Sequence, residues 1–385
     1  MPDSLAADEL VALIKRVFEP SSGDKKLALL VDLPDGLVPD NEDWRRRRQM
    51  VGLWFQHLTT RKSDLGLEEI HLVLYPNAHA NNADLPEFAT YYRDPVLPTT
   101  AEAVDAFETS FEEILAEHQI LIAPTHFSAT APLKNATKKF GCRAATMPGF
   151  TEAMIPALRI DYGVVSSRVN TLKQLLDNAV QCDLEFSASG EDFQFVIDLR
   201  YRKAHASSGA FPVAGEAGNL PSGEAYIVPY EGERSDDPSQ TEGLLPVQIG
   251  DDIVVYRVMS NKAVAVLSDN ETSQRESELL KQEPAYGNIA ELGLGVLGDF
   301  GLEPTGEILL DEKLGLHIAF GRSEHFGGTV GPDSFRSRDR VVHIDRVYIP
   351  KLQPKIQVRA ATFKMADGSS VPLMERGGYV ISFES

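Results

Sequence analysis

Hydrophobic positions in the first half of the chain alternate between helical spacing and short continuous runs. Apolar residues that recur every three or four positions predict amphipathic helices, and short apolar runs bounded by turn residues predict buried strands. Strands that alternate with helices in this way are typical of a mostly parallel sheet with helices on its faces. The pattern predicts helices at 6–18, 43–58, 101–118 and 131–140, and strands at 27–33, 70–75, 120–123 and 143–147.

The second half has a different pattern, in which apolar and polar residues alternate with a period of two. This alternation predicts antiparallel strands, and glycine, proline, asparagine and aspartate separate the segments as turn residues do. We therefore expect an α/β domain at 1–180, followed by a β-rich α+β domain at 181–385. The predicted strands of the second domain include 183–188, 193–199, 252–258 and 263–267, and a helix is predicted at 272–282.

Composition and charge narrow the range of partners. The 385 residues include 37 Lys+Arg and 57 Asp+Glu, which gives a formal net charge of −20. Such acidity disfavours binding to nucleic acid or to an anionic membrane surface, because both need a basic face. The apolar runs are far shorter than the roughly 20 residues of a membrane-spanning helix. Cys142 and Cys182 are too few for a disulfide framework, so we expect a cytoplasmic protein.

Two segments place histidine where it suits metal binding. His343 and Asp345 lie at positions i and i+2 of an apolar segment, and on a strand such residues point to the same face. An imidazole and a carboxylate so placed form a compact pair of ligands for a divalent metal. The alternative is an exposed histidine beside an aspartate in a salt bridge. His317 lies inside an apolar run, where a core histidine bonded to a backbone carbonyl is the simpler interpretation.

Acidic residues complete the set of candidates. Glu224 begins an apolar segment after a tight turn, and Glu291 lies inside an apolar, glycine-rich segment. For each of these glutamates, the alternative is an edge residue that points to water. Charged residues are costly to bury beside apolar strands unless a cation or a hydrogen-bond network satisfies them. The segments on either side of the histidine at 317 add three more candidates, Glu312, Glu324 and His325.

Four short motifs that contain these candidates occur in a specific order. They are Asn219-Leu-Pro-Ser-Gly-Glu224-Ala-Tyr, Ile289-Ala-Glu291-Leu-Gly-Leu-Gly, His317-Ile-Ala-Phe-Gly and Val342-His343-Ile-Asp345. In this order, the motifs resemble the aminopeptidase T-type (thermophilic) metallopeptidase family. The resemblance covers residues 205–385 and is weaker upstream, where 142–152 is similar to a loop of the same superfamily.

The resemblance implies a metal-dependent hydrolase similar to an aminopeptidase. In such an enzyme, a metal-activated water attacks a peptide or amide bond next to a free amine. The implied substrate is a small molecule or a short peptide, and the implied assembly is a homodimer. Mixed nitrogen and oxygen ligands suit two divalent ions of Zn, Co or Mn. By the resemblance, the metal ligands are Glu224, Glu291, His317, His343 and Asp345.

The chain departs from the family at one position. The family has a further tyrosine ligand seven residues after the histidine of the third motif, and this chain has Glu324 there, followed by His325. We expect Glu324, His325 or Glu312, in that order, to transfer the proton to the leaving amine. Arg322 is a candidate for binding a substrate carboxylate, and a surface salt bridge is the alternative.

Two other functions stay open at this point. The same superfamily includes a branch similar to 2,5-dihydroxypyridine dioxygenase, a mononuclear non-heme iron enzyme that cleaves a ring. A site of that kind would bind one Fe(II) through His343, Asp345 and either His317 or Glu291. That branch has histidine at the position of Glu291 and lacks the glutamate at 224, so both glutamates of this chain favour the hydrolase. The second alternative is a non-catalytic metal-binding protein.

Overall fold

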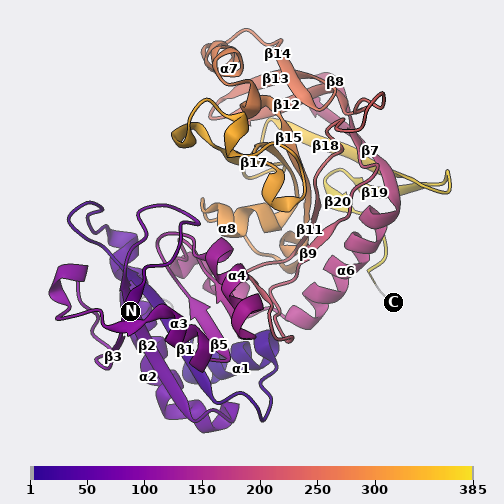
Figure 1. The fold of residues 1–385 in the computed structure, drawn as a ribbon. Coiled ribbons are helices and arrows are strands. Elements are labelled where there is room, and N and C mark those ends of the chain that lie inside the picture. The colour runs from indigo at the N-terminus through magenta and orange to yellow at the C-terminus, as the bar shows by residue number, and fades with distance from the viewer. Residues whose placement is uncertain (1–3, 384–385) are drawn as a thin grey trace. The chain divides into compact units, whose positions relative to one another are not determined.

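The computed structural model describes residues 4–383, which divide into two compact units (Figure 1). The first unit contains the chain up to Ser166 together with Ser207–Ser222, and the second contains Ser167–Ala206 together with the chain from Gly223 onwards. Residues 207–222 join the first unit because β10 (Ala217–Asn219) pairs with a strand of its sheet. The division into compact units does not test whether 1–180 and 181–385 fold independently, so these two domains stay a prediction.

A mostly parallel sheet of seven strands forms the centre of the first unit. The order is β10-β6-β5-β1-β2-β3-β4, in which the pairs from β10 to β2 are parallel and the last two pairs are antiparallel. All but the first residue of β1 are buried, as expected for a parallel strand that is covered on both faces. The remaining bounds are β1 (Lys26–Leu33), β2 (Glu69–Pro76), β3 (Phe88–Tyr92), β4 (Thr109–Ser110), β5 (Ile120–Ala123) and β6 (Arg143–Thr146).

Helices cover this sheet on its faces. Apolar residues of α3 (Phe111–Glu117) and α4 (Thr130–Phe140) form one core with alternate residues of β1 and β2. Helix α2 (Glu42–Arg61) also packs on β1 and β2, and it contacts α1 (Ala7–Phe18). The short α5 (Ile155–Leu158) follows, and α6 runs from Tyr162 to Asn178. Within the described residues, no helix is both long and apolar enough to cross a membrane.

The predicted helix at 101–118 is wrong over its first half. Ala101–Ala103 is a single 3-10 turn, and the next regular element is the short strand β4. The α-helix begins only at Phe111, because the side chain of Ser110 accepts a hydrogen bond from the backbone N–H of Glu112 and caps it. Of the four consecutive arginines at 45–48 in α2, Arg47 and Arg48 are buried.

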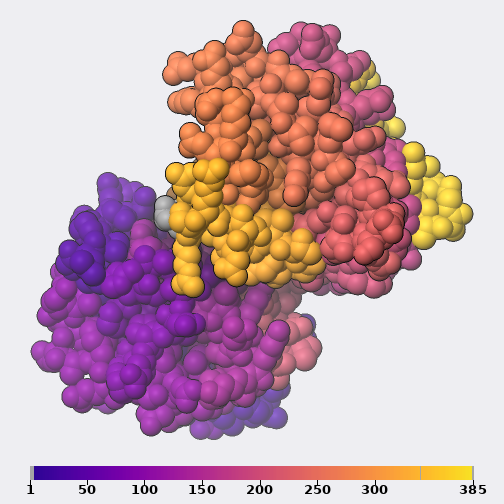
Figure 2. Space-filling model, turned by 45° about the horizontal axis from the view of Figure 1, so that its top comes forward, coloured from indigo at the N-terminus to yellow at the C-terminus, as the bar shows by residue number. Residues whose placement is uncertain are grey.

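An antiparallel sheet of eight strands forms much of the second unit. Its order is β14-β13-β12-β8-β7-β18-β19-β20, and α7 (Glu271–Gln282) contacts β13 and β14. The tip of the β18–β19 hairpin is exposed and stands out from the surface (yellow in Figure 2). The strands are β7 (Ala179–Ala188), β8 (Glu191–Asp198), β12 (Glu242–Ile249), β13 (Asp252–Met259), β14 (Lys262–Val266), β18 (Ile356–Met365), β19 (Ser370–Glu375) and β20 (Gly378–Tyr379).

A second, smaller sheet of five strands has the order β17-β16-β15-β11-β9. Every residue of β11, β15 and β16 is buried, so any charged side chain on these strands is enclosed by protein. The bounds are β9 (His205–Ser207), β11 (Glu224–Ile227), β15 (Ile289–Gly295), β16 (Leu316–Gly321) and β17 (His343–Val347), and the short α8 (Ile308–Asp311) precedes β16. The predicted fold class, an α/β part followed by a β-rich part, is confirmed.

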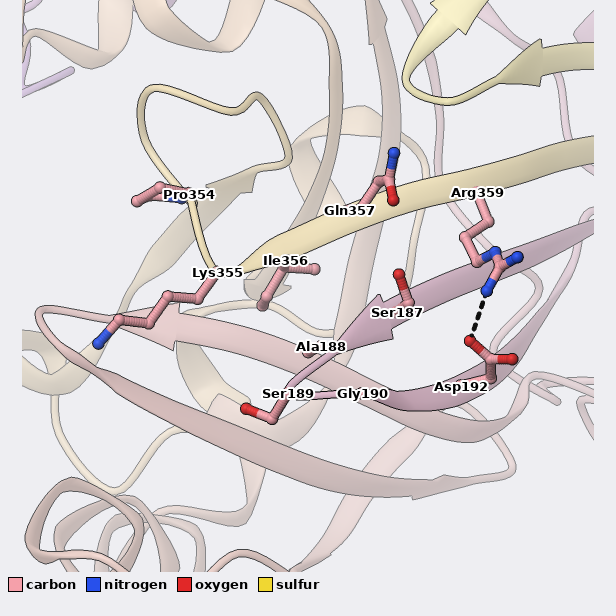
Figure 3. A pocket seen from close by; sticks show the side chains of 10 residues that line it. All are labelled: Ser187, Ala188, Ser189, Gly190, Asp192, Pro354, Lys355, Ile356, Gln357 and Arg359. Carbon is pink, nitrogen blue, oxygen red and sulfur yellow. Dashed lines mark hydrogen bonds and ion pairs between the residues drawn. The ribbon is translucent and has the colours of Figure 1, made fainter.

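A surface pocket of ≈ 390 Å³ lies where the β7–β8 turn meets the start of β18 (Figure 3). Its lining is mainly small and polar, and its one internal ion pair joins Arg359 Nη1 to Asp192 Oδ1 at 2.9 Å. The ten lining residues include one carboxylate and no imidazole or thiol, so this pocket lacks the ligands of a transition-metal site.

Candidate metal centre

Four adjacent strands of the five-stranded sheet carry the five proposed metal ligands. Glu224 begins β11, Glu291 lies on β15, His317 on β16, and His343 and Asp345 on β17. Because these strands are neighbours, side chains from distant parts of the chain meet. Their ligand atoms form two groups, each within 4.8 Å: group 1 is Glu224, Glu291 and His317, and group 2 is Glu291, His343 and Asp345.

Two local features of β15 make room for this arrangement. The register between β15 and β16 shifts between Ile289 and Glu291, and such a bulge re-aims the side chain that follows it. Gly293 lies directly opposite His317 in the ladder, and a Cβ atom at 293 would stand 1.9 Å from His317 Nε2. The glycine-rich character of this segment therefore has a specific cause: the imidazole lies across a backbone that has no side chain there.

Glu291 is the residue that the two groups share. Its Oε1 lies 3.4 Å from His317 Nε2, and its Oε2 lies 3.3 Å from His343 Nε2. Burial disfavours its charge, but hydrogen bonds to the two imidazoles outweigh burial and hold the pKa of Glu291 below its usual range. The Glu291 carboxylate is thus ionised and has one oxygen directed at each histidine.

The two outer carboxylates each have an oxygen that lacks a hydrogen-bond partner. Glu224 Oε2 lies 3.6 Å from His317 Nε2, and Asp345 Oδ1 lies 3.5 Å from His343 Nε2. Both oxygens are buried and accept no hydrogen bond from any described residue. Leaving a buried carboxylate oxygen unsatisfied is costly, so these two atoms point to a cation as their partner.

Both histidines direct their Nε2 atoms at the carboxylates, where such a cation would bind. The Nδ1 atom of His343 lies 2.8 Å from the carbonyl oxygen of Arg322, and Nδ1 of His317 lies 3.4 Å from that of Gly315. A carbonyl only accepts, so Nδ1 carries the hydrogen and Nε2 faces the carboxylates, as in metal sites where a second contact orients the imidazole. The donor set of three carboxylates and two imidazoles therefore fits divalent cations.

The raised pKa values of the two histidines also indicate a site that favours cations. Burial opposes a positive charge on His317, but the hydrogen bond to Glu291 and the charges of Glu224 and Glu291 outweigh it and raise the pKa of His317 to about 9. Burial also opposes a positive charge on His343, but Asp345 and Glu291 outweigh it and raise the pKa of His343 well above its ordinary value. A metal ion competes with these protons for Nε2, and the negative field that holds the protons also favours the metal.

A lysine takes part in group 1, although the sequence did not suggest a role for it. Lys313 is 1% exposed, and its Nζ donates hydrogen bonds to Glu224 Oε1, at 2.5 Å, and to Glu312. Burial raises the pKa of Glu312 to about 8 against the opposing positive charge of Lys313, and the negative charges of Glu224 and Asp345 act in the same direction as burial. Because Lys313 is bonded to both Glu224 and Glu312, Glu312 lies at the edge of the ligand cluster. Glu312 is one of the three acid/base candidates.

The other two acid/base candidates lie in the loop after β16. The Glu324 carboxylate pairs with both sides of the Arg322 guanidinium, at 2.6 Å to Nε and 2.8 Å to Nη2, and belongs to neither ligand group. The ring of His325 lies 5.4 Å from the ring of His343, centroid to centroid. Burial and the positive charges of His343 and Arg322 lower the pKa of His325 to about 4. Because Arg322 is paired with Glu324, its guanidinium is bonded within its own loop.

Aromatic side chains that the sequence did not single out border the cluster. Phe326 lies edge-on to His343, with ring centroids 5.6 Å apart, and edge-on to Tyr226 at 5.0 Å. The ring of His205 stacks on Tyr226 at 5.1 Å, and its Nε2 lies 3.0 Å from the carbonyl oxygen of Phe326. Sequence reasoning missed these residues because a single aromatic residue in an apolar segment is more often part of a core.

In the first unit, His126 lies in the loop after β5. Its ring stacks on Trp44, with centroids 4.2 Å apart, and its backbone N–H donates to Asp32. Asp32 is buried at the end of β1 and also accepts hydrogen bonds from the Phe127 N–H and the Trp44 indole. These contacts account for His126 as part of the local structure of that unit.

Comparisons with known proteins place the chain by its fold. No family model matches the sequence, and no curated protein matches it. Among solved structures, 2,5-dihydroxypyridine dioxygenase from Pseudomonas putida KT2440 superposes with a TM-score of 0.61 at 13% identity, over 98% of this chain and 99% of that one. Wild-type AmpT from Thermus thermophilus superposes with a TM-score of 0.52 at 17% identity, over 97% and 99% of the two chains. The chain therefore shares its fold, over nearly its whole length, with both of these proteins.

Proposed function

We propose that this chain is a metal-dependent hydrolase resembling an aminopeptidase, which cleaves a peptide or amide bond next to a free amine. The observation that carries the proposal is the position of Glu291 between His317 and His343. One carboxylate shared by two ligand groups suits a pair of neighbouring divalent ions, because a bridging carboxylate screens their mutual repulsion.

The ligands favour Zn, Co or Mn, because each group combines one imidazole with two carboxylates. Glu224, Glu291 and His317 would hold one ion, and Glu291, His343 and Asp345 the other. When bound, such ions lower the pKa of water and polarise a carbonyl, which is the chemistry that amide hydrolysis needs.

The chain's own residues divide the remaining tasks. Glu312 is the acid/base candidate that we now prefer, because it contacts the ligand cluster through Lys313. Glu324 is tied to Arg322, so it is better suited to ordering the loop after β16 than to moving a proton. Tyr226 and Phe326 offer an aromatic surface beside His343, where an apolar part of a small substrate or short peptide would lie. A homodimer remains part of the proposal.

A ring-cleaving dioxygenase with one Fe(II) is the second candidate. The fold likeness to 2,5-dihydroxypyridine dioxygenase favours it, with a TM-score of 0.61 against 0.52 for AmpT. The ligand chemistry favours the hydrolase, since a facial triad has two imidazoles and one carboxylate, and each group here has the reverse composition. A metal-binding protein without catalysis is the third candidate.

Metal analysis combined with two assays separates these functions. Protein purified without oxygen is analysed for metals, stripped with a chelator, and reloaded with Zn, Co, Mn or Fe(II). The hydrolase predicts that Zn, Co or Mn restores cleavage of aminoacyl anilides and that Glu291→Gln abolishes it. Glu303→Gln is the control, because Glu303 is an exposed glutamate paired with Lys351. Oxygen consumption with Fe(II) and a dihydroxylated heteroaromatic, without anilide cleavage, would establish the dioxygenase instead. Metal binding without either activity would leave the non-catalytic protein.

A further inference from the structure

Glu224 already has a cationic partner within the protein. The ammonium of Lys313 donates to Glu224 Oε1 at 2.5 Å and also contacts the Glu312 carboxylate. The Lys313 side chain is 2% exposed, so water does not compensate its charge; Glu224 does, and Glu312 accepts a second hydrogen bond from the same ammonium. Lys313 thus holds one oxygen of a group 1 ligand, and the other oxygen, Oε2, is the buried atom without a hydrogen-bond partner.

The backbone of Lys313 is fixed against β15, which limits how far its side chain can move away. A Cβ atom at Gly295 would stand 2.3 Å from the carbonyl carbon of Lys313, so the two backbones are in direct contact. Gly295 also donates its N–H to the carbonyl of Gly315, at 2.9 Å. Release of Glu224 therefore requires the Lys313 side chain to change rotamer within a confined space.

The two ligand groups also differ in charge. In group 2, Glu291 and Asp345 are two carboxylates beside a histidine, and among the described residues no lysine or arginine is bonded to them; their charge of −2 matches one divalent ion. In group 1, Glu224 is neutralised by Lys313. A divalent ion that enters group 1 must share Glu224 with the ammonium and lie close to its positive charge, which is unfavourable in a buried site.

We propose that Lys313 makes the two ion positions unequal: group 2 binds the first divalent ion, and group 1 binds a second ion more weakly, because that ion must compete with Lys313 for Glu224. The inference rests on the proposed metal site and adds the order in which that site fills. Lys313 thereby sets how many ions the protein holds at a given metal concentration.

Equilibrium dialysis of the full chain against Zn²⁺ tests this order. We expect one tightly bound ion per chain and a second that binds at least tenfold more weakly. Lys313→Met removes the competing charge at similar side-chain length, and should bring the affinity for the second ion to within a few-fold of the first. The matched control is Lys351→Met, an exposed lysine paired with Glu303, which should leave both affinities unchanged.

A measurement on the unaltered protein keeps the inference testable even if Lys313→Met does not fold. Crystals grown with one equivalent of Zn²⁺ should show a single anomalous peak between Glu291, His343 and Asp345, with Lys313 still bonded to Glu224. A peak in group 1, or two peaks of equal height, would overturn the inference while leaving the proposed metal site intact. Absence of bound Zn²⁺ in both experiments would instead remove the metal site and the proposed function.

Discussion

The imidazole of His317 lies across the backbone of Gly293, so close that a Cβ atom at 293 would stand 1.9 Å from Nε2. The two residues face each other in the antiparallel ladder of β15 and β16. The approach places Nε2 between the carboxylates of Glu224 and Glu291, at 3.6 Å and 3.4 Å. A glycine on one strand thus determines where a proposed metal ligand on the next strand lies.

Gly293→Ala should therefore displace His317 and weaken metal binding in group 1. We expect the affinity for the second ion to fall at least tenfold, because a ligand nitrogen moves while group 2 keeps its own ligands. Dialysis against Zn²⁺ measures the change. Gly36→Ala is a suitable control, since the nearest atom to a Cβ there is 3.9 Å away. Unchanged metal content in Gly293→Ala would show that His317 is not a ligand.

Metal binding should stabilise the second unit, because the buried cluster has unpartnered carboxylate oxygens. A ligand at about 100 times its dissociation constant adds about 2.7 kcal/mol to the free energy of unfolding. For a unit of this size, that corresponds to an increase of roughly 5–10 °C in the melting temperature. Calorimetry with Zn²⁺ and with a chelator measures the difference, and Glu291→Gln should abolish it. An equal response to Zn²⁺ in Glu291→Gln would place the bound ion elsewhere.

The contacts of Glu312 and Glu324 predict different effects on turnover. Glu312→Gln should lower kcat by about 10²–10⁴-fold with little change in KM, as for the loss of a general acid or base. Glu324→Gln should have a much smaller effect on kcat, because its carboxylate is bonded to Arg322 within the loop. Steady-state kinetics on an aminoacyl anilide compares the variants. A larger loss of kcat in Glu324→Gln would restore the order that the sequence suggested.

The stability of the first unit should fall as the pH rises from about 4 to about 6. Burial raises the pKa of Asp32 from 3.8 to about 6, although the His126 and Phe127 N–H groups favour the ionised form. In this pH window the unfolded chain has released the proton and the folded chain still holds it, so rising pH favours unfolding. The shift corresponds to about 3 kcal/mol. Urea unfolding at several pH values should show this slope in the unaltered protein and lose it in Asp32→Asn.

A pair of histidines in the first unit should make stability depend on pH in the opposite direction to Asp32. His71 Nδ1 lies 2.7 Å from His118 Nε2, and burial lowers the pKa of both histidines. The unfolded chain therefore binds more protons below pH 6.5, so the folded state loses stability as the pH falls through this range. His118→Gln should reduce the loss, which urea unfolding between pH 5 and pH 7 would detect. An unchanged pH dependence in that variant would show that the pair is not its source.

Local patterns in the sequence predicted much of the fold because they reflect the geometry of single elements. The apolar run at 27–33 is β1, a strand buried along almost all its length. The spacing of His343 and Asp345 predicted that both point to one face of a strand, and both contribute to group 2. The prediction failed at 101–118, where helical spacing continues through a strand and the helix starts only at the cap of Ser110.

By itself, the sequence determined the α/β and β-rich halves, the strand positions of the charged candidates, and the resemblance carried by four motifs. Only the tertiary structure decided that Glu291 lies between two histidines, that Lys313 holds Glu224, and that Glu324 is paired with Arg322. The physical reason is that periodicity follows from backbone geometry within one segment, whereas these contacts depend on strand order and on a bulge that aligns segments far apart in the chain.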